Sequence, residues 1–305
     1  MLGKRLRLGS TIGLISPASP EDIKAIQKAI LFLKIQGFNV IEGRHLYDKW
    51  GYLAGTDKDR ATDIMEMFKN QAVDMILCIR GGYGSSRILP YLDYDVIKEN
   101  PKIFAGFSDI TVFLNSFYEK CDLTTFHSPM GTSNLEDIET FKSFMFTFMQ
   151  GYKPYTIKNP SEFATRCIAS GIACGNLIGG NLSLICSSLG TPYEINMKDK
   201  ILFIEEVGEA PYRVDRLLTQ LLLAKKLQQC AGIILGQFKG CDLPHYERSL
   251  TLEEVFQDRL YNLDIPMFSG FCSGHDYPKL TLPIGSRVQM NAETGVINVL
   301  EAVVG

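Results

Sequence analysis

The stretch Lys-Ile-Phe-Ala-Gly-Phe-Ser-Asp-Ile-Thr, residues 102 to 111, decides how this chain is interpreted. Its first half is a short apolar run typical of a buried strand, and residues 110 to 114 continue as an amphipathic helix. Ser108 therefore falls at a sharp strand-to-helix turn that would project its hydroxyl from the edge of a sheet. The pattern indicates a nucleophile elbow, although Ile110 replaces the second glycine of Gly-x-Ser-x-Gly. The alternative is that Ser108 only caps the helix.

The rest of the first half repeats this alternation of strand and helix. Short apolar runs at residues 11 to 16, 38 to 41 and 75 to 79 are each followed by a turn and a stretch with helical spacing. This order is typical of βαβ units, which build a parallel sheet. We therefore expect an N-terminal α/β domain over residues 1–150, with helices flanking a parallel sheet, and this domain carries Ser108.

The second half is expected to form another domain. Residues 151–174 lose clear periodicity and contain two prolines, so they are interpreted as a linker. Residues 175–305 alternate again between strand and helix patterns, and their last two apolar runs flank Asn291-Ala292-Glu293-Thr294-Gly295. This arrangement predicts a second α/β domain that ends in a β-hairpin.

Composition narrows the classes of function. Apolar residues make up 46% and charged residues 21% of the 305, and the net charge is only −3, as in an ordinary soluble protein. The only basic cluster is Lys4-Arg5-Leu6-Arg7, so nucleic acid is not an expected partner. No run approaches the roughly 18 apolar residues of a membrane span, and no membrane partner is expected. The eight cysteines form no Cys-x-x-Cys pair and are interpreted as reduced core thiols.

A glycine-rich loop follows the third strand pattern. Arg80-Gly81-Gly82-Tyr83-Gly84 lies at the carboxyl end of that strand, the edge where open α/β sheets bind ligands. The backbone N–H groups of Gly82 and Asp109 could donate to a developing oxyanion. A phosphate cradle is the weaker alternative, because the loop lacks both the Gly-Lys-Ser/Thr ending and the spacing of a dinucleotide fingerprint.

A serine nucleophile needs a base, and the chain has four histidines. His275 lies in a glycine-bearing loop directly after a strand, a placement that suits a catalytic imidazole. His127 also follows a short strand and is the competing candidate. His45 and His245 lie in polar surroundings that suggest surface positions. An ordinary surface or core role remains the alternative for His275.

An orienting carboxylate is expected at a strand end. The run Ile201 to Ile204 leads into Glu205 and Glu206, whose side chains point in opposite directions if the strand continues, so only one can face a site. The alternative is a pair of solvated charges. No His-Glu-x-x-His, zinc-type Cys/His cluster or calcium loop occurs, so neither a metal nor a cofactor is expected.

Five segments, taken together and in order, resemble a known family. They are Ile79–Arg87, Gly106–Thr111, Gly175–Leu182, Leu202–Glu206 with Pro211–Arg216, and Gly274–His275 with Leu280–Gly285. In this order they are similar to the LD-carboxypeptidase family, serine peptidases of the S66 type that include muramoyltetrapeptide carboxypeptidases and microcin C self-immunity peptidases. Since they cover nearly the whole chain, the resemblance is far more specific than any one motif.

The resemblance implies a Ser-His-Glu triad of Ser108, His275 and Glu205, with an oxyanion hole from the backbone N–H groups of Gly82 and Asp109. Ser108 would come from the first domain and the other two from the second, which would put the site between domains. The resemblance further implies a cytoplasmic homodimer that needs no metal. Its substrate would be a muropeptide or related small peptide, cut between the L-centre of a diamino acid and a terminal D-alanine in peptidoglycan recycling.

The substrate contacts and the branch of the family stay open at this point. Arg80 or Arg213 could bind a terminal carboxylate through bidentate hydrogen bonds, or either could form a structural ion pair. No long insertion precedes the His275 segment, which favours the tetrapeptide enzymes over the microcin branch. The alternatives are a microcin C-type immunity peptidase that hydrolyses acyl-sulfamoyl adenylates, and a non-catalytic α/β ligand-binding protein.

Overall fold

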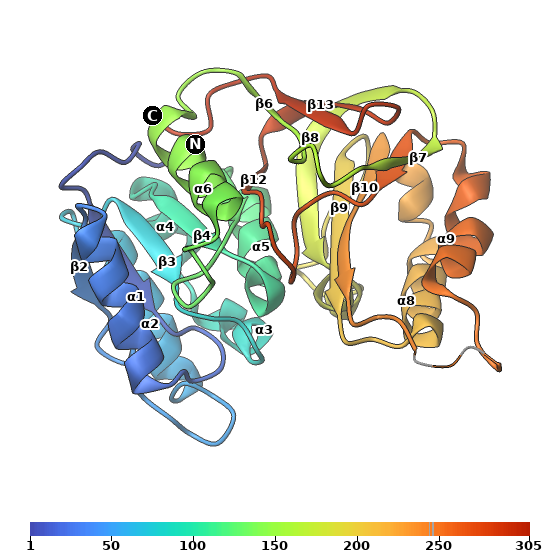
Figure 1. The fold of residues 1–305 in the computed structure, drawn as a ribbon. Coiled ribbons are helices and arrows are strands. Elements are labelled where there is room, and N and C mark those ends of the chain that lie inside the picture. The colour runs from blue at the N-terminus through green and yellow to red at the C-terminus, as the bar shows by residue number, and fades with distance from the viewer. Residues whose placement is uncertain (244, 246) are drawn as a thin grey trace. The chain divides into compact units, whose positions relative to one another are not determined.

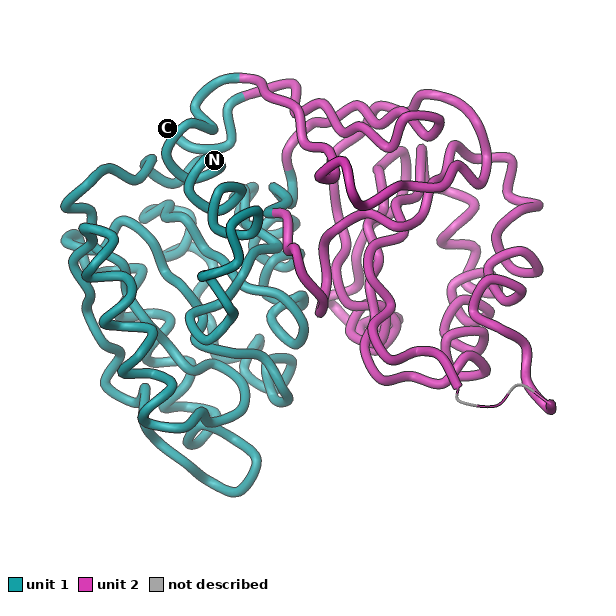
Figure 2. The backbone as a smooth tube through the Cα atoms, viewed as in Figure 1, with its two compact units in different colours: residues 1–153, 281–285, 302–305 teal, residues 154–280, 286–301 magenta. Residues whose placement is uncertain are grey.

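The computed structural model describes residues 1–243, 245 and 247–305 and divides into two compact units. Unit 1 comprises Met1–Lys153, Thr281–Gly285 and Ala302–Gly305, and unit 2 comprises Pro154–Leu280 and Ser286–Glu301 (Figure 2). Each unit is a β-sheet with helices packed against it (Figure 1). The predicted α/β class is confirmed.

The sheet of unit 1 has six strands in the order β12-β5-β4-β3-β1-β2. Strands β2, β1, β3, β4 and β5 run parallel, and β12 pairs antiparallel with β5. All residues of β3 and β4 are buried, which explains their continuous apolar runs. The strands are β1 (Thr11–Ile15), β2 (Asn39–Glu42), β3 (Met75–Cys78), β4 (Ile103–Gly106), β5 (Thr125–His127) and β12 (Leu282–Ile284).

The helices of unit 1 begin where the local sequence supplies a cap. Asp22 caps α1, and Thr56 with Asp59 forms a capping box on α2. Phe104 on β4 packs its ring against those of Phe68 and Phe117 from two helices. The helical segments are α1 (Ile23–Ile35), α2 (Asp57–Lys69), α3 (Ser85–Ile88), η1 (Leu89–Tyr91), α4 (Tyr94–Glu99), η2 (Ser108–Ile110), α5 (Thr111–Cys121) and α6 (Ile138–Gln150).

The strand order fixes where a ligand can bind in unit 1. The parallel strands follow the doubly wound order 2-1-3-4-5. The connection from β1 runs to β2 on one side, whereas the connection from β3 runs to β4 on the other side. Such a switch point opens a crevice beyond the carboxyl ends of these strands. The loops after β1, β3 and β4 therefore gather at one edge, and they carry Ser19, Gly81 with Gly82, and Ser108.

Unit 2 contains a mixed sheet of eight strands in the order β6-β14-β13-β8-β9-β10-β11-β7. Strands β8 to β11 run parallel, and the remaining pairs are antiparallel. The predicted terminal hairpin is confirmed as β13 and β14. The strands are β6 (Tyr155–Ile157), β7 (Arg166–Ala169), β8 (Ile172–Asn181), β9 (Ile201–Val207), β10 (Gly232–Lys239), β11 (Met267–Ser269), β13 (Arg287–Asn291) and β14 (Val296–Val299).

Helix α8 packs against both α7 and α9 in unit 2. Residue Asn181 caps α7, and Pro211 occupies the first turn of α8, where its missing N–H costs no hydrogen bond. Across the described residues, no helix is both long enough and apolar enough to cross a bilayer. The segments are α7 (Leu182–Ser187), α8 (Pro211–Leu223), η3 (Leu227–Gln229), α9 (Leu252–Leu260) and η4 (Tyr261–Leu263).

Two stretches differ from the sequence expectation. Residues 151–174, interpreted as a linker, contain β6, β7 and the start of β8. Residues 281–285 and 302–305, grouped by sequence with the second domain, belong to unit 1, where β12 pairs with β5. Strands β6, β7 and β12 are only three or four residues long and pair with partners far away in the sequence, so no local period predicts them.

The ring cluster around Phe104 gives a test of the unit 1 core. Phe104→Ala removes a fully buried ring and should lower the free energy of unfolding by about 3–5 kcal/mol through lost burial and a residual cavity. Trp50, the only tryptophan, lies in unit 1, so its fluorescence during urea denaturation reports on that unit. The control Phe146→Ala, at a ring that is 45% exposed, should cost about 1 kcal/mol or less. Equal losses in both variants would contradict this assignment of the core.

Candidate active site

Ser108 has an unusual backbone conformation at the end of β4. Its φ is +64°, in the left-handed region that residues with a Cβ rarely adopt. The η2 turn begins at Ser108 and leads directly into α5, and neither segment shows a side-chain cap. The hydroxyl is therefore not used as a helix cap, which was the alternative interpretation. A strained serine between strand and helix is the geometry of a nucleophile elbow.

The glycine loop after β3 passes directly beside Ser108. A Cβ built on Gly81 would lie 2.9 Å from Ser108 Cβ and 3.1 Å from its Oγ, so this approach requires glycine. The same point lies 3.3 Å from the backbone nitrogen of Asp109. Within the described part of the chain, the N–H groups of Gly82 and Asp109 donate no hydrogen bond. Both groups thus remain available to a ligand.

Ser19, in the loop after β1, holds the glycine loop. Its N–H donates to the carbonyl of Gly81 at 3.3 Å, and its Oγ accepts the N–H of Tyr83 at 3.1 Å. The two bonds bracket the backbone of Gly82. Sequence analysis did not single out Ser19. The available signal was its position in a Ser-Pro-Ala-Ser-Pro loop at the carboxyl end of the first strand.

Two buried charged side chains connect the turns around Ser108. The Asp109 carboxylate accepts the Ser85 N–H at 2.8 Å, and its burial raises the pKa of Asp109. Arg60, only 1% exposed, donates to the carbonyls of Pro17 at 2.6 Å and Gly84 at 2.9 Å. These bonds tie the loops after β1, β3 and β4 to one another around Ser108.

Unit 2 brings Glu205 and His275 together. The Glu205 carboxylate is fully buried, and its Oε2 lies 2.6 Å from His275 Nδ1. Because an ionised carboxylate only accepts hydrogen bonds, we assign the proton to Nδ1 and the basic lone pair to Nε2. Glu206 instead accepts bonds from Asn181 Nδ2 at 2.8 Å and Ser183 Oγ at 2.7 Å. The two glutamates point in opposite directions, as their places on a strand predicted.

The loop that carries His275 is fastened to β10. Gln237 Nε2 donates to the carbonyl of Pro278 at 3.0 Å, and Gln237 Oε1 accepts the N–H of Asp276 at 2.9 Å. Gly274 has a φ of +142°, and a Cβ there would lie 3.1 Å from Glu205 Oε2. Sequence analysis missed Gln237, because a strand glutamine gives no signal for a contact about 40 residues away.

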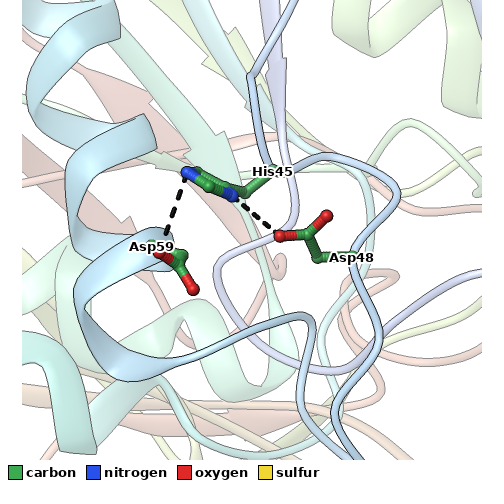
Figure 3. Close-up of side chains that lie close together, drawn as sticks. All are labelled: His45, Asp48 and Asp59. Carbon is green, nitrogen blue, oxygen red and sulfur yellow. Dashed lines mark hydrogen bonds and ion pairs between the residues drawn. The ribbon is translucent and has the colours of Figure 1, made fainter.

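The other histidines occupy different surroundings. His127 is buried on β5 with its ring 5.9 Å from that of Phe107. His245 is exposed, as predicted. His45, predicted at the surface, has only 19% of its side chain exposed. Its Nδ1 lies 2.7 Å from Asp48 Oδ2 and its Nε2 3.8 Å from Asp59 Oδ1 (Figure 3).

Among the described residues, His45, Asp48 and Asp59 form the only group of three His, Cys, Asp or Glu side chains that lie close enough to hold a metal ion. Both carboxylates already have protein partners. Asp48 pairs with the imidazole, and Asp59 accepts bonds from the N–H and hydroxyl of Thr56 at the start of α2. We therefore interpret the group as a hydrogen-bonded anchor for the loop between β2 and α2.

Both candidate substrate arginines make ion pairs within their own unit. Arg80 Nη1 lies 3.6 Å from Glu21 Oε2, and Arg213 Nη1 lies 3.2 Å from Glu209 Oε2. Their side chains remain 40% and 49% exposed, so each keeps donors that face solvent. All eight cysteines are free thiols; six are buried as expected, and two, Cys167 and Cys174, are exposed instead.

An α/β sheet that presents a strained serine at a strand-to-helix turn, with unused backbone donors beside it, defines the class of hydrolases with a serine nucleophile. Two family models match the chain, the LD-carboxypeptidase N-terminal domain over residues 12–128 and the LD-carboxypeptidase C-terminal domain over residues 174–290. The chain belongs to the LD-carboxypeptidase family.

Individual relatives agree with this assignment. The probable murein peptide carboxypeptidase of Bacillus subtilis is 40% identical, with 96% of this chain and 93% of the relative covered. The muramoyltetrapeptide carboxypeptidase structure from Oxalobacter formigenes has a TM-score of 0.84 at 28% identity, with 96% and 99% covered. The microcin C7 self-immunity protein MccF of Escherichia coli is 30% identical over 99% of this chain and 96% of its own length. A MccF structure with aspartyl sulfamoyl adenosine has a TM-score of 0.92 at 28% identity, with both chains fully covered.

The strain at Ser108 can be measured by comparing two truncations. A left-handed residue with a Cβ costs roughly 1–2 kcal/mol, so Ser108→Gly should be more stable than Ser108→Ala by about 1 kcal/mol. At Ser116, inside α5, the order should reverse by about the same amount, because glycine weakens a helix interior. Urea denaturation followed by Trp50 fluorescence measures both differences. The same order at both positions would argue against a strained Ser108.

Proposed function

We propose that this protein is a serine LD-carboxypeptidase that removes the terminal D-alanine from muropeptide tetrapeptides in peptidoglycan recycling. The observation that carries the proposal is Ser108, held at a φ of +64° beside Gly81 with two unused backbone donors close by. Family membership supports the class of reaction. The similar chain from Bacillus subtilis, named for murein peptides, supports the class of substrate.

The proposed mechanism passes through an acyl-enzyme. His275 Nε2 takes the proton of Ser108 as Oγ attacks the carbonyl carbon before D-alanine, and the N–H groups of Gly82 and Asp109 stabilise the resulting oxyanion. His275 then gives the proton to the leaving amine, and water hydrolyses the ester by the reverse sequence. Glu205 holds the imidazole tautomer and stabilises the imidazolium. The reaction requires an Oγ to Nε2 distance of about 2.6–3.2 Å in the reacting complex.

A terminal carboxylate on the substrate calls for a cationic partner. We propose Arg80 or Arg213 for this role, since each keeps solvent-facing donors beside its ion pair. Arg80 directly precedes the Gly81-Gly82 backbone, so a carboxylate bound there would lie near the proposed oxyanion donors. A guanidinium can hold a carboxylate through two parallel hydrogen bonds.

We further propose that the protein acts in the cytoplasm as a homodimer, as the family resemblance implies. Eight free thiols suit a reducing compartment. A net charge of −3 with no extended basic cluster gives no support for nucleic acid as a partner.

A second candidate function is hydrolysis of an acyl-sulfamoyl adenylate. The likeness to MccF favours it, since a solved MccF structure holds aspartyl sulfamoyl adenosine. A third candidate, from another class, is a ligand-binding protein that keeps this architecture without the chemistry. Such a protein would bind the peptide without forming a covalent bond to Ser108.

Substitution of the nucleophile separates these candidates. Ser108→Ala should lower D-alanine release from a muramoyl tetrapeptide by about 10⁴-fold or more, because the acyl-enzyme cannot form. The matched control Ser86→Ala, at an exposed serine of α3, should retain wild-type turnover. Chromatography of the products measures release, with an acyl-sulfamoyl adenylate assayed in parallel.

The outcomes of that experiment differ for each candidate. Faster cleavage of the adenylate than of the tetrapeptide would favour the microcin-type function. Turnover that survives in Ser108→Ala would refute the serine mechanism. A fluorophosphonate that adds no mass to Ser108 in folded protein would favour the binding protein.

The neighbouring glutamates should separate catalysis from stability. Glu205→Gln should lower kcat by as much as about 10⁴-fold, the loss found when the orienting carboxylate of a serine triad becomes an amide. Glu206→Gln should keep most of the activity and destabilise the protein by about 1–3 kcal/mol, because donors from Asn181 and Ser183 lose a carboxylate. Steady-state kinetics and calorimetry measure the two effects. Equal activity losses would contradict these separate roles.

A further inference from the structure

Lys279, a few residues beyond His275, is a buried cation that the proposed mechanism does not use. It is 5% exposed, and lysine is almost never buried to this extent without a partner. Its Nζ donates to the carbonyl of Gly274 at 2.6 Å and lies 4.7 Å from the centre of the Tyr277 ring. The side chain thus folds back on the loop that carries His275 and closes it from Gly274 to Lys279.

Glu205 presents a complementary electrostatic need. Its carboxylate is fully buried, with one oxygen bonded to His275, while Oε1 makes no hydrogen bond to any described residue. A buried carboxylate with an unsatisfied oxygen is costly unless a cation lies close by. Burial lowers the pKa of Lys279 to about 8, and the charge of Glu205 opposes this lowering. Lys279 therefore remains largely protonated at neutral pH.

We infer that Lys279 is a positioning residue for the Glu205–His275 pair: its hydrogen bond fixes Gly274, and its charge offsets that of the buried carboxylate. Gly274 directly precedes His275 and lies against Glu205, so movement of its peptide would move the imidazole. The part of this inference that concerns catalysis rests on the proposed function. The effect of Lys279 on protonation of the pair does not.

Other charges near Lys279 supply a matched control. Besides Glu205 on β9, it interacts with Lys239 on β10 and with Asp276 on its own loop. Lys239 Nζ lies 3.3 Å from Asp276 Oδ1, and its side chain is 48% exposed. Lys239 has the same charge and borders the same loop, but solvent screens it.

The sign of the expected effect follows from the charges. Lys279→Met removes a cation that repels the imidazolium and favours the carboxylate. The pair should then take up its proton at a higher pH, by on the order of one pH unit, as for a charge lost within a few ångströms. The acid limb of kcat/KM should move in the same direction. Lost positioning should lower kcat by about 10-fold or more, within the roughly 10⁴-fold ceiling of general base catalysis.

Histidine NMR tests the inference without any substrate. Ring carbon–proton spectra of the full chain with labelled histidines are followed against pH, and His275→Gln identifies the His275 signal among the four. The variants are Lys279→Met, Lys279→Gln, Lys279→Arg and Lys239→Met. Glutamine keeps a donor for Gly274 without charge, and arginine keeps the charge. If Lys279→Met does not fold, the glutamine and arginine variants carry the test.

The pH midpoint of the His275 titration should rise in Lys279→Met and Lys279→Gln. It should return toward the wild-type value in Lys279→Arg and stay unchanged in Lys239→Met. An unchanged midpoint in a folded variant without charge at position 279 would overturn the inference. An equal rise in Lys239→Met would overturn it as well, because any nearby charge would then suffice. If the midpoint shifts but wild-type protein releases no D-alanine, the proposed function fails and the electrostatic coupling stands.

Discussion

A serine with a φ of +64° persists only where neighbouring structure holds it in place. In unit 1 that support is glycine backbone and buried hydrogen bonds. Gly81 allows the loop after β3 to approach Ser108 to a distance that any side chain would block. Asp109 is held by Ser85, and Arg60 joins the carbonyls of two further loops. The conformation of the proposed nucleophile thus depends on contacts among three strand ends.

Unit 2 solves a different physical problem, a carboxylate removed from water. Glu205 is buried with one oxygen bonded to His275, and Lys279 supplies a cation close by. Glu206, one residue further along β9, is equally buried but has its hydrogen bonds satisfied by Asn181 and Ser183. A satisfied carboxylate acts as a structural brace, whereas a carboxylate with one free oxygen depends strongly on nearby charge. This contrast is why we assign different roles to neighbouring residues of one type.

Local patterns in the sequence predicted those parts of the fold and site that local physics determines. The strand before Ser108, the glycine loop after β3 and the opposite directions of Glu205 and Glu206 all follow from side-chain period and turn chemistry. The strands β6, β7 and β12 were missed because each has three or four residues and pairs with a distant partner. Ser19, Gln237 and Lys279 were missed because Gly81, Pro278 and Glu205, with which they interact, lie far from them in the sequence. Their partners become neighbours only when the chain folds.

The costly features of both units occur at or beyond the carboxyl ends of parallel strands. In unit 1 the strained Ser108 follows β4, and in unit 2 Glu205 lies near the end of β9 while the His275 loop follows β11. Loops at these ends are freed from pairing, so the strain at Ser108 disturbs no ladder of hydrogen bonds, whereas Glu205 stays in the ladder opposite Asn181. Strain and unsatisfied buried polar groups lower stability. Their retention at these positions therefore points to a functional requirement. Their position, together with their chemistry, supports the proposal that these residues serve a reaction.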